Sequence, residues 1–253
     1  MTRLFVHSLM LIPLFFSVQS TYAANVTFTL EDAKQVEEKK ILANLKDRQW
    51  FAQMSAIIDQ HFHFNEAVKI VFGSDEGPLF DPQDNSILIP YAFIVGAEYY
   101  FRKNAYQKEY GVDSTEAAIH TLIHTLFHEL AHAYILDQDI AILGKEEDAA
   151  DNLATLLILE NFDQGDSIAI SAADMFAFES EDGPEYYDSL DYIGEHSFDL
   201  QRYFSTLCLV YGANPKKHPD LLNEVDVEAV AERQEYCQYY FETVQINWHR
   251  HLK

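Results

Sequence analysis

Basic residues are scarce in this 253-residue sequence, which holds 17 Lys and Arg against 41 Asp and Glu. The formal net charge at pH 7 is −24. A chain this acidic repels the phosphates of nucleic acids and anionic lipid headgroups, so we expect neither as a partner. The charge suits basic substrates or partners. A solvated acidic surface that keeps the protein soluble is the simpler explanation.

Long apolar runs are also missing after residue 24, so no stable insertion into a membrane is expected. The start of the chain is different, because an apolar run from Leu4 to Val18 follows Arg3 and ends near the small residues Ala23 and Ala24. This pattern is typical of a secretory signal peptide, with a membrane anchor as the alternative. We predict a signal peptide over residues 1–24 and a periplasmic or secreted protein.

Cysteine occurs only at Cys208 and Cys237. In an oxidising compartment an even number of cysteines favours disulfide pairing, so we predict one Cys208–Cys237 disulfide. The chain-entropy model gives such a bond roughly 3 kcal/mol of stability. A cysteine metal site is the weaker alternative, because the C-x-x-C spacing is absent.

The rest of the chain is long enough for one domain with a full core, and we assign residues 25–253 to a single domain. Apolar residues at helical spacing predict helices over 31–64, 91–107, 114–135, 146–161, 197–211 and 228–248. The run AVKIVF at 67–72 predicts a strand, and 79–80 with 87–89 around the turn DPQDNS predict a hairpin. Gly212 is expected to end its helix, and the acidic stretch 179–191 to form a loop. The fold class is therefore α+β, mostly helical with a small mixed sheet.

Residues 128–132 read HELAH and lie on the predicted helix 114–135. Positions i and i+4 share one helix face, so His128 and His132 can hold one metal ion through their ring nitrogens. Glu129 can reach a water molecule on the metal rather than the metal itself. Zinc hydrolases divide the work in this way, with two imidazoles as ligands and the carboxylate as general base. The motif can arise by chance, but its place on an otherwise apolar helix favours a metal site.

The stretch GKEEDAAD supplies a third ligand for such a site. Glu147 and Asp151 are four residues apart and share a face of the predicted helix 146–161. We predict Glu147 as the third zinc ligand and Asp151 as the hydrogen-bond partner of a ligand histidine. Glu146 competes for the ligand role but points about 100° away. The alternative is that these acids only stabilise a helix N-terminus.

HELAH followed by E-x-x-A-D resembles the gluzincin metallopeptidases, including the CAAX prenyl peptidase group. In that group the Glu of the second helix is the third ligand and the Asp four residues later supports the site, which matches Glu147 and Asp151. The prenyl peptidases are embedded in membranes and this chain predicts no spans, so their substrates do not carry over.

The chain is more closely similar to an uncharacterised family of exported bacterial metallopeptidases, through HTLFHELAHAYI, GKEEDAADNLATL and GEHSFDLQRYFSTLCLVYG. The likeness runs from about Val68 to Trp248. It implies a zincin-like fold with an HExxH active-site helix behind a small sheet, whose edge strand pairs with an extended peptide. We expect Ile87–Ile89 to be that edge strand.

The stretch EHSFDLQRY carries further candidate site residues. Zinc peptidases stabilise the oxyanion with a His, Tyr or Arg from a later segment, and His196 is the first candidate here. Arg202 and Tyr203 are the next. Alternatively, Glu195, Asp199 and Arg202 form a salt-bridge cluster at a helix end.

Two more histidines extend the helical ladder upstream of the motif. His120 and His124 stand four residues apart, and His124 stands four residues before His128. A second metal is possible on this spacing. We expect ordinary hydrogen bonds in the core or at the surface instead.

Together these patterns predict an exported zinc-dependent metallopeptidase with Zn²⁺ as cofactor, a peptide or protein as substrate and Glu129 as general base. The alternative is a zincin scaffold that binds zinc without hydrolysis and acts as a binding module. Glu129 argues against that alternative, because a structural site uses a fourth protein ligand instead. A zinc hydrolase for a non-peptide amide, for example in cell-wall material, fits the same motif.

Overall fold

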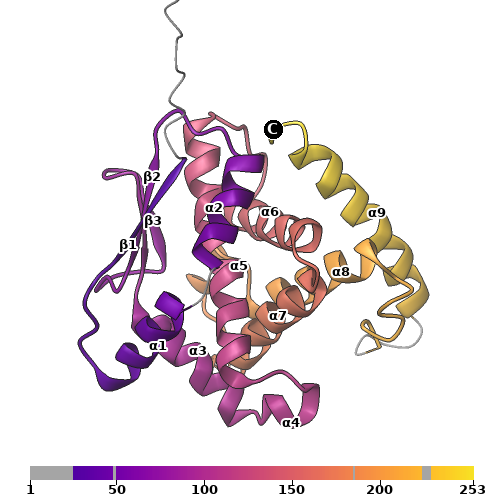
Figure 1. The fold of residues 1–253 in the computed structure, drawn as a ribbon. Coiled ribbons are helices and arrows are strands. Elements are labelled where there is room, and N and C mark those ends of the chain that lie inside the picture. Colours follow the sequence, from indigo (N-terminus) through magenta and orange to yellow (C-terminus); the bar gives the residue numbers. More distant parts are fainter. Residues whose placement is uncertain (1–24, 48–49, 185, 224–228) are drawn as a thin grey trace, which may run out of the picture.

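The computed structural model describes residues 25–47, 50–184, 186–223 and 229–253. The predicted signal peptide, residues 1–24, lies outside these ranges. The described strands are β1 (Val26–Leu30), β2 (Val68–Phe72), β3 (Leu79–Asp81) and β4 (Ser86–Ile89). The described helices are α1 (Val36–Asp47), α2 (Trp50–His61), α3 (Tyr91–Lys103), α4 (Tyr106–Tyr110), α5 (Ser114–Asp137), α6 (Glu146–Asn161), α7 (Gly165–Glu181), the 3-10 helix η1 (Asp191–Ile193), α8 (Asp199–Ala213) and α9 (Val230–Trp248). The predicted α+β class is confirmed (Figure 1).

The strands form one mixed sheet in the order β1-β2-β4-β3. The first three are parallel neighbours, and β3 pairs antiparallel to β4. The predicted hairpin is present, but the prediction that Ile87–Ile89 forms the sheet edge was wrong. β4 pairs with β2 on one side and β3 on the other, and its Ile87 and Ile89 are fully buried. The three half-buried residues of β3 form the edge.

Strand β1 was not predicted. Its sequence VTFTL alternates between apolar and polar residues, and Val26 is buried while Thr27 is exposed. The helix predicted over 31–64 is described as α1 and α2, on either side of residues 48–49, which lie outside the described ranges. The helix predicted over 91–107 ends at Lys103, because Ala105 takes up the left-handed conformation before α4.

Helix α5 runs through the middle of the molecule (Figure 1). It packs against α3, α6 and α7 and also touches β3 and β4, so most of its surface is covered. A helix that is apolar nearly all round is expected at such a place. At its start Asp113 accepts a hydrogen bond from the N–H of Thr115. Helix α6 follows with the predicted bounds and packs against α5.

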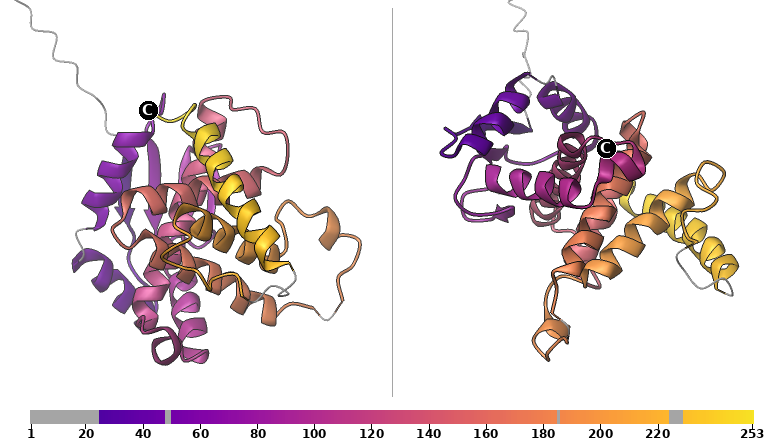
Figure 2. Two further views of the ribbon diagram at one scale, coloured as in Figure 1. Left: turned by 90° about the vertical axis from the view of Figure 1, so that its right-hand side faces the viewer. Right: turned by 90° about the horizontal axis from the view of Figure 1, so that it is seen from below.

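Helix α7 was missed by the sequence analysis and takes in residues 179–181 of the predicted loop. Residues 186–198, which lead into α8, project from the body of the molecule in both views of Figure 2. Among the described residues no helix is long and apolar enough to cross a membrane.

Helices α8 and α9 pack closely, and the predicted disulfide between Cys208 and Cys237 joins them. Gly212 does not end α8 as expected, because the helix continues to Ala213. A Cβ atom on Gly212 would lie 2.2 Å from the carbonyl oxygen of Cys237. The glycine therefore permits the close approach of α9 instead of a left-handed turn.

Candidate metal centre

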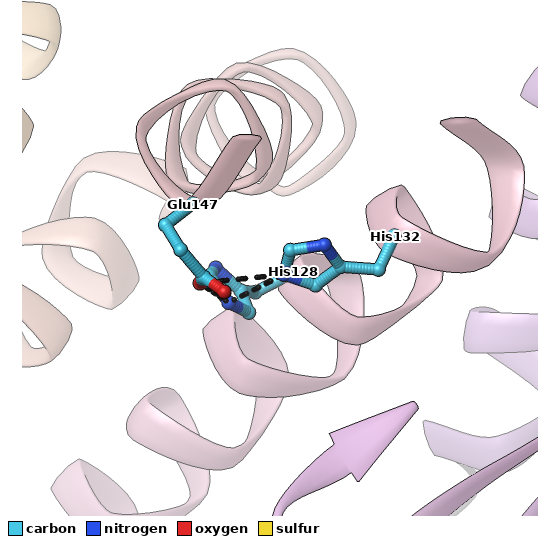
Figure 3. Close-up of side chains that lie close together, drawn as sticks. All are labelled: His128, His132 and Glu147. Carbon is cyan, nitrogen blue, oxygen red and sulfur yellow. Dashed lines mark hydrogen bonds and ion pairs between the residues drawn. The ribbon is translucent and has the colours of Figure 1, made fainter. Parts of the chain in front are cut away.

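His128 and His132 extend from the same face of α5 toward the first turn of α6, which carries Glu147 (Figure 3). The Nε2 atoms of the two histidines are 3.2 Å apart. Oε2 of Glu147 lies 3.1 Å from Nε2 of His128 and 3.3 Å from Nε2 of His132. In the described part of the chain, these three residues form the one group of His, Cys, Asp or Glu side chains arranged to hold a metal ion.

The buried Oε2 atom of Glu147 tests whether a metal fits this group. Three imidazole nitrogens surround it, including Nε2 of His196 at 2.9 Å. Among the described residues, this carboxylate oxygen is buried and makes no hydrogen bond. Burial of a charged oxygen in this state is costly unless a cation balances it. Two imidazoles and one carboxylate are also the donor set of many catalytic zinc sites, so the residues fit zinc.

Each ligand histidine has its own carboxylate behind it. Nδ1 of His128 lies 2.7 Å from Oδ1 of Asp151, and Nδ1 of His132 lies 2.9 Å from Oε1 of Glu146. A carboxylate accepts an N–H, so these contacts place the proton on Nδ1 and leave the Nε2 lone pairs for a metal. From the sequence, Glu146 was expected only as a competitor of Glu147 for the role of third ligand. The signal that could have revealed it is its place beside Glu147 at the start of the same helix.

Arg202 lies behind Asp151. Its Nε and Nη2 atoms donate to the two carboxylate oxygens of Asp151 at 2.8 and 2.9 Å, and its guanidinium carbon lies 4.0 Å from the centre of the Phe176 ring. Among the described residues, the ion pair of Arg202 is with Asp151 and not with Glu195 or Asp199, so the alternative of a helix-end cluster is not what forms. Arg202 orients Asp151, which in turn orients His128.

Tyr203, the other later candidate, is buried in the small core between α7, α8 and α9. Its neighbours in that core include the disulfide and Phe176. Of the three residues proposed for the oxyanion, the structure therefore brings His196 to the metal centre.

His196 lies just before α8. Its ring is nearly parallel to that of His128, with the two ring centres 6.3 Å apart. The Nζ of Lys145 donates to its backbone oxygen at 2.8 Å, which ties this segment to the start of α6. Its side chain is 55% exposed, far more than those of His128 and His132, so it can meet a bound molecule.

Neighbouring charges shift the pKa values of the residues in this site. Burial lowers the pKa of His128, but the nearby carboxylates of Asp151 and Glu147 outweigh burial and raise the pKa to about 9. Burial likewise raises the pKa of Asp151, yet His128 and Arg202 hold it well below the ordinary range. Asp151 is therefore ionised and a hydrogen-bond acceptor at neutral pH.

Glu129 is buried beside the ligands. Burial raises its pKa above the ordinary value, and this effect exceeds the opposing influence of His128, His132 and a hydrogen bond with the Phe80 backbone. Phe80 belongs to the edge strand β3, so the carboxylate lies where the sheet edge meets the metal centre. A carboxylate with a raised pKa is suited to proton transfer near neutral pH.

A cleft of about 860 Å³ opens over the metal centre. One wall is β3 with its flanking prolines, the floor is α5, and the far wall combines the start of α6 with residues 194–196. The acidic side chains at this cleft are Glu129, Asp139, Glu146, Glu147 and Glu195.

The upstream histidines do not join the metal centre. Nδ1 of His120 lies 3.0 Å from Oγ of Ser171, and Nε2 of His124 lies 3.2 Å from Oγ1 of Thr155. Both histidines are buried. They make hydrogen bonds in the core, as expected.

A family model with the description "Putative metallopeptidase" matches residues 30–252. The chain belongs to this family. No curated protein and no solved structure matched the chain.

Membership of a metallopeptidase family supports a hydrolase that acts on peptide bonds. The matched residues include β2 to β4, the metal centre and both cysteines. Sequence similarity to this family and the geometry of the His128, His132 and Glu147 group both indicate a metal site.

Proposed function

We propose that this protein is an exported zinc-dependent metallopeptidase. The observation that carries the proposal is the convergence of three donor atoms, Nε2 of His128, Nε2 of His132 and Oε2 of Glu147, within 3.3 Å of one another. Zinc takes such N,N,O sets when a further position stays open for water or substrate. The zincin-like arrangement of this helix pair beside a small sheet belongs to the same proposal.

Bound zinc acts as a Lewis acid and makes water nucleophilic near neutral pH. Glu129 follows His128 directly in the sequence and lies near both ligand histidines in space, and its carboxylate is the general base. It takes one proton from the attacking water and gives it to the nitrogen of the leaving amine. The carboxylate returns to its ionised form, so one water is consumed for each peptide bond.

His196 is the oxyanion stabiliser in this proposal. Its Nε2 faces the metal centre and its ring is exposed to the cleft. A hydrogen bond from an imidazole N–H to the developing oxyanion stabilises the transition state more than the substrate. Loss of this donor is expected to lower kcat more than it raises KM.

The edge strand β3 binds the substrate backbone. It is short and half-buried, lines the cleft through Leu79 and Phe80, and pairs with β4 on one side only. An extended peptide that adds to this edge gains main-chain hydrogen bonds without a requirement for particular side chains. The strand proposed for this role is thus β3 and not β4.

The protein acts on its peptide or protein substrate in the periplasm or outside the cell. The signal-peptide pattern at residues 1–24 supports this location, and so does the disulfide between Cys208 and Cys237. Disulfides persist in oxidising compartments.

The deciding experiment measures zinc content and casein hydrolysis of the protein beside the Glu129→Gln variant. We expect one zinc per chain in both, with hydrolysis only in the unmodified protein. Zinc in both and hydrolysis in neither favours the non-catalytic zinc-binding scaffold. Equal hydrolysis by both proteins rules out Glu129 as the base, and no zinc in either rules out the metal site.

A further inference from the structure

A second, smaller pocket opens beside the metal centre. Its volume is about 190 Å³, and it shares Pro78, His128, Glu129 and His196 with the main cleft. It therefore begins at the ligand histidine and the proposed base. Whole-ligand sites are typically larger than 300 Å³, so this pocket matches one side chain of a bound peptide.

Helix α7 forms the inner wall of this pocket. Ala172, Met175, Phe176 and Glu179 all line it, and their spacing of i, i+3, i+4 and i+7 places them on one helix face. Phe93 of α3 lies among the other lining residues. The α7 wall is thus apolar apart from the one carboxylate of Glu179, while Thr121, His124 and Thr125 of α5 make another wall polar.

The carboxylate of Glu179 is partly buried and, in the described ranges, takes part in no hydrogen bond or ion pair, which is unusual for an acid. Burial raises its pKa to about 7, Asp199 adds to this effect and Arg202 opposes it. A cation brought next to this group would regain the electrostatic stabilisation that burial removes.

The other charged groups at the pocket are already engaged. Arg202 donates two hydrogen bonds to Asp151. Burial lowers the pKa of His124 to about 4, so this side chain is neutral at pH 7, and its Nε2 contacts Thr155. Of the two carboxylates that line the pocket, Glu179 is the one that lies away from the metal centre and takes part in no hydrogen bond or ion pair among the described residues.

We propose that this pocket receives a basic side chain of the substrate, next to the scissile bond, and that Glu179 pairs with its cationic end. The methylene chain of a Lys or Arg lies against Phe93, Met175 and Phe176, and its charged group reaches the carboxylate. Glu179 is thus a specificity residue. The inference rests on the proposed peptidase function, and it agrees with the net charge of −24.

Two octapeptide mixtures test the proposal. They are random except at one central position, which is Lys in one mixture and norleucine in the other, so the probes differ by a single ammonium group. We expect the Lys mixture to be hydrolysed with a kcat/KM about ten- to a hundredfold higher, as a charge-assisted hydrogen bond predicts. Glu179→Gln should remove this preference with little change for norleucine. The matched control Glu181→Gln, at an exposed position of the same helix, should keep it.

Binding separates this inference from the peptidase proposal. Calorimetry with the zinc-supplied Glu129→Gln protein measures the affinity for both mixtures without turnover. A preference for Lys that Glu179→Gln abolishes supports the pocket even if no peptide is hydrolysed. Equal affinity and equal hydrolysis for both mixtures overturn it while leaving the peptidase proposal intact. A Lys preference that survives Glu179→Gln also overturns it. If Glu179→Gln fails to fold, the two mixtures are still compared with the unmodified protein, where the absence of a Lys preference overturns the proposal.

Discussion

The two ring nitrogens of each ligand histidine have different partners. In His128 and His132 the Nε2 atoms converge on Glu147, and the Nδ1 atoms face carboxylates. This fixes both tautomers and both ring planes before any metal binds. The spacing of HELAH and of Glu147 and Asp151 was enough to predict two of these three partner residues, Glu147 and Asp151. The role of Glu146 depends on how α5 and α6 lie against each other, which sequence spacing does not define.

The charge chain from Arg202 through Asp151 to His128 leads to a prediction. Asp151→Asn should weaken zinc binding about 10- to 100-fold, because His128 loses its anionic partner. It should also lower the free energy of unfolding by about 3–5 kcal/mol, because Arg202 stays charged and buried. The double variant Asp151→Asn with Arg202→Met should regain much of that stability and none of the zinc affinity. Competition with a chelator and urea unfolding measure the two effects. Parallel recovery of both would contradict the assigned role of Asp151.

Glu146 should matter less than Asp151. Its side chain is 49% exposed while that of Asp151 is 10% exposed, so water can replace its hydrogen bond to His132. We expect Glu146→Ala to weaken zinc binding less than tenfold, measured by the same chelator competition. The control is Asp148→Ala, at an exposed position one residue beyond Glu147, which should bind zinc as tightly as the unmodified protein. An effect of Glu146→Ala as large as that of Asp151→Asn would be evidence against this ranking.

At the scale of helices and strands, the sequence was sufficient to predict a segment where its apolar residues recur with one clear period. The buried run of β2, the hairpin of β3 and β4, and the bounds of α6 follow from such patterns. Helix α7 was missed because its run of small and apolar residues, GDSIAISAADMFAF, gives no clear polar face. The predicted edge strand, Ile87–Ile89, was wrong because an edge position depends on tertiary pairing, which puts β4 beside β2. The α7 wall of the smaller pocket and the position of β3 at the sheet edge therefore became visible only in the tertiary structure.

Two glycines in helices offer a matched prediction about packing. Gly212→Ala should lower the free energy of unfolding by about 1–3 kcal/mol, because its Cβ would lie 2.2 Å from a backbone oxygen of α9. Gly96→Ala in α3 should raise stability by about 0.5–1 kcal/mol, because nothing lies within 4 Å of the new Cβ and alanine favours a helix. Urea unfolding measures both. A Gly212→Ala variant as stable as the unmodified protein would show that α8 and α9 lie further apart.

At the scale of the whole molecule, one core joins the two ends of the described chain. The buried cluster includes Val26 of β1 and Leu252 near the C-terminus, along with most of α5 and α6. The metal centre lies on the buried helix pair, whereas the disulfide joins α8 to the outer helix α9. A change at the disulfide is thus expected to alter stability without altering metal binding.

The disulfide should act on stability alone. Cys208→Ser with Cys237→Ser should lower the free energy of unfolding by roughly 3–4 kcal/mol, because the unfolded chain gains the freedom of an open loop. Zinc affinity should stay unchanged, because neither cysteine contacts the ligands. Unfolding with and without a reductant checks this, since the reductant should destabilise the unmodified protein and leave the double variant unaffected. A loss of zinc in the double variant would mean that the two regions are coupled.

Zinc should stabilise the whole molecule, because its three ligands come from two helices of the central core and are assembled only in the folded state. At a free zinc concentration a hundred times the Kd, mass action adds about 2.7 kcal/mol. For a domain of this size the Tm rises by roughly 5–10 °C. A thermal scan with zinc and then with a chelator measures the gain and its reversal. His132→Ala should abolish the gain, whereas His249→Ala, at an exposed position after α9, should keep it. An equal gain in His132→Ala would show that the zinc binds elsewhere and would contradict the proposed zinc site.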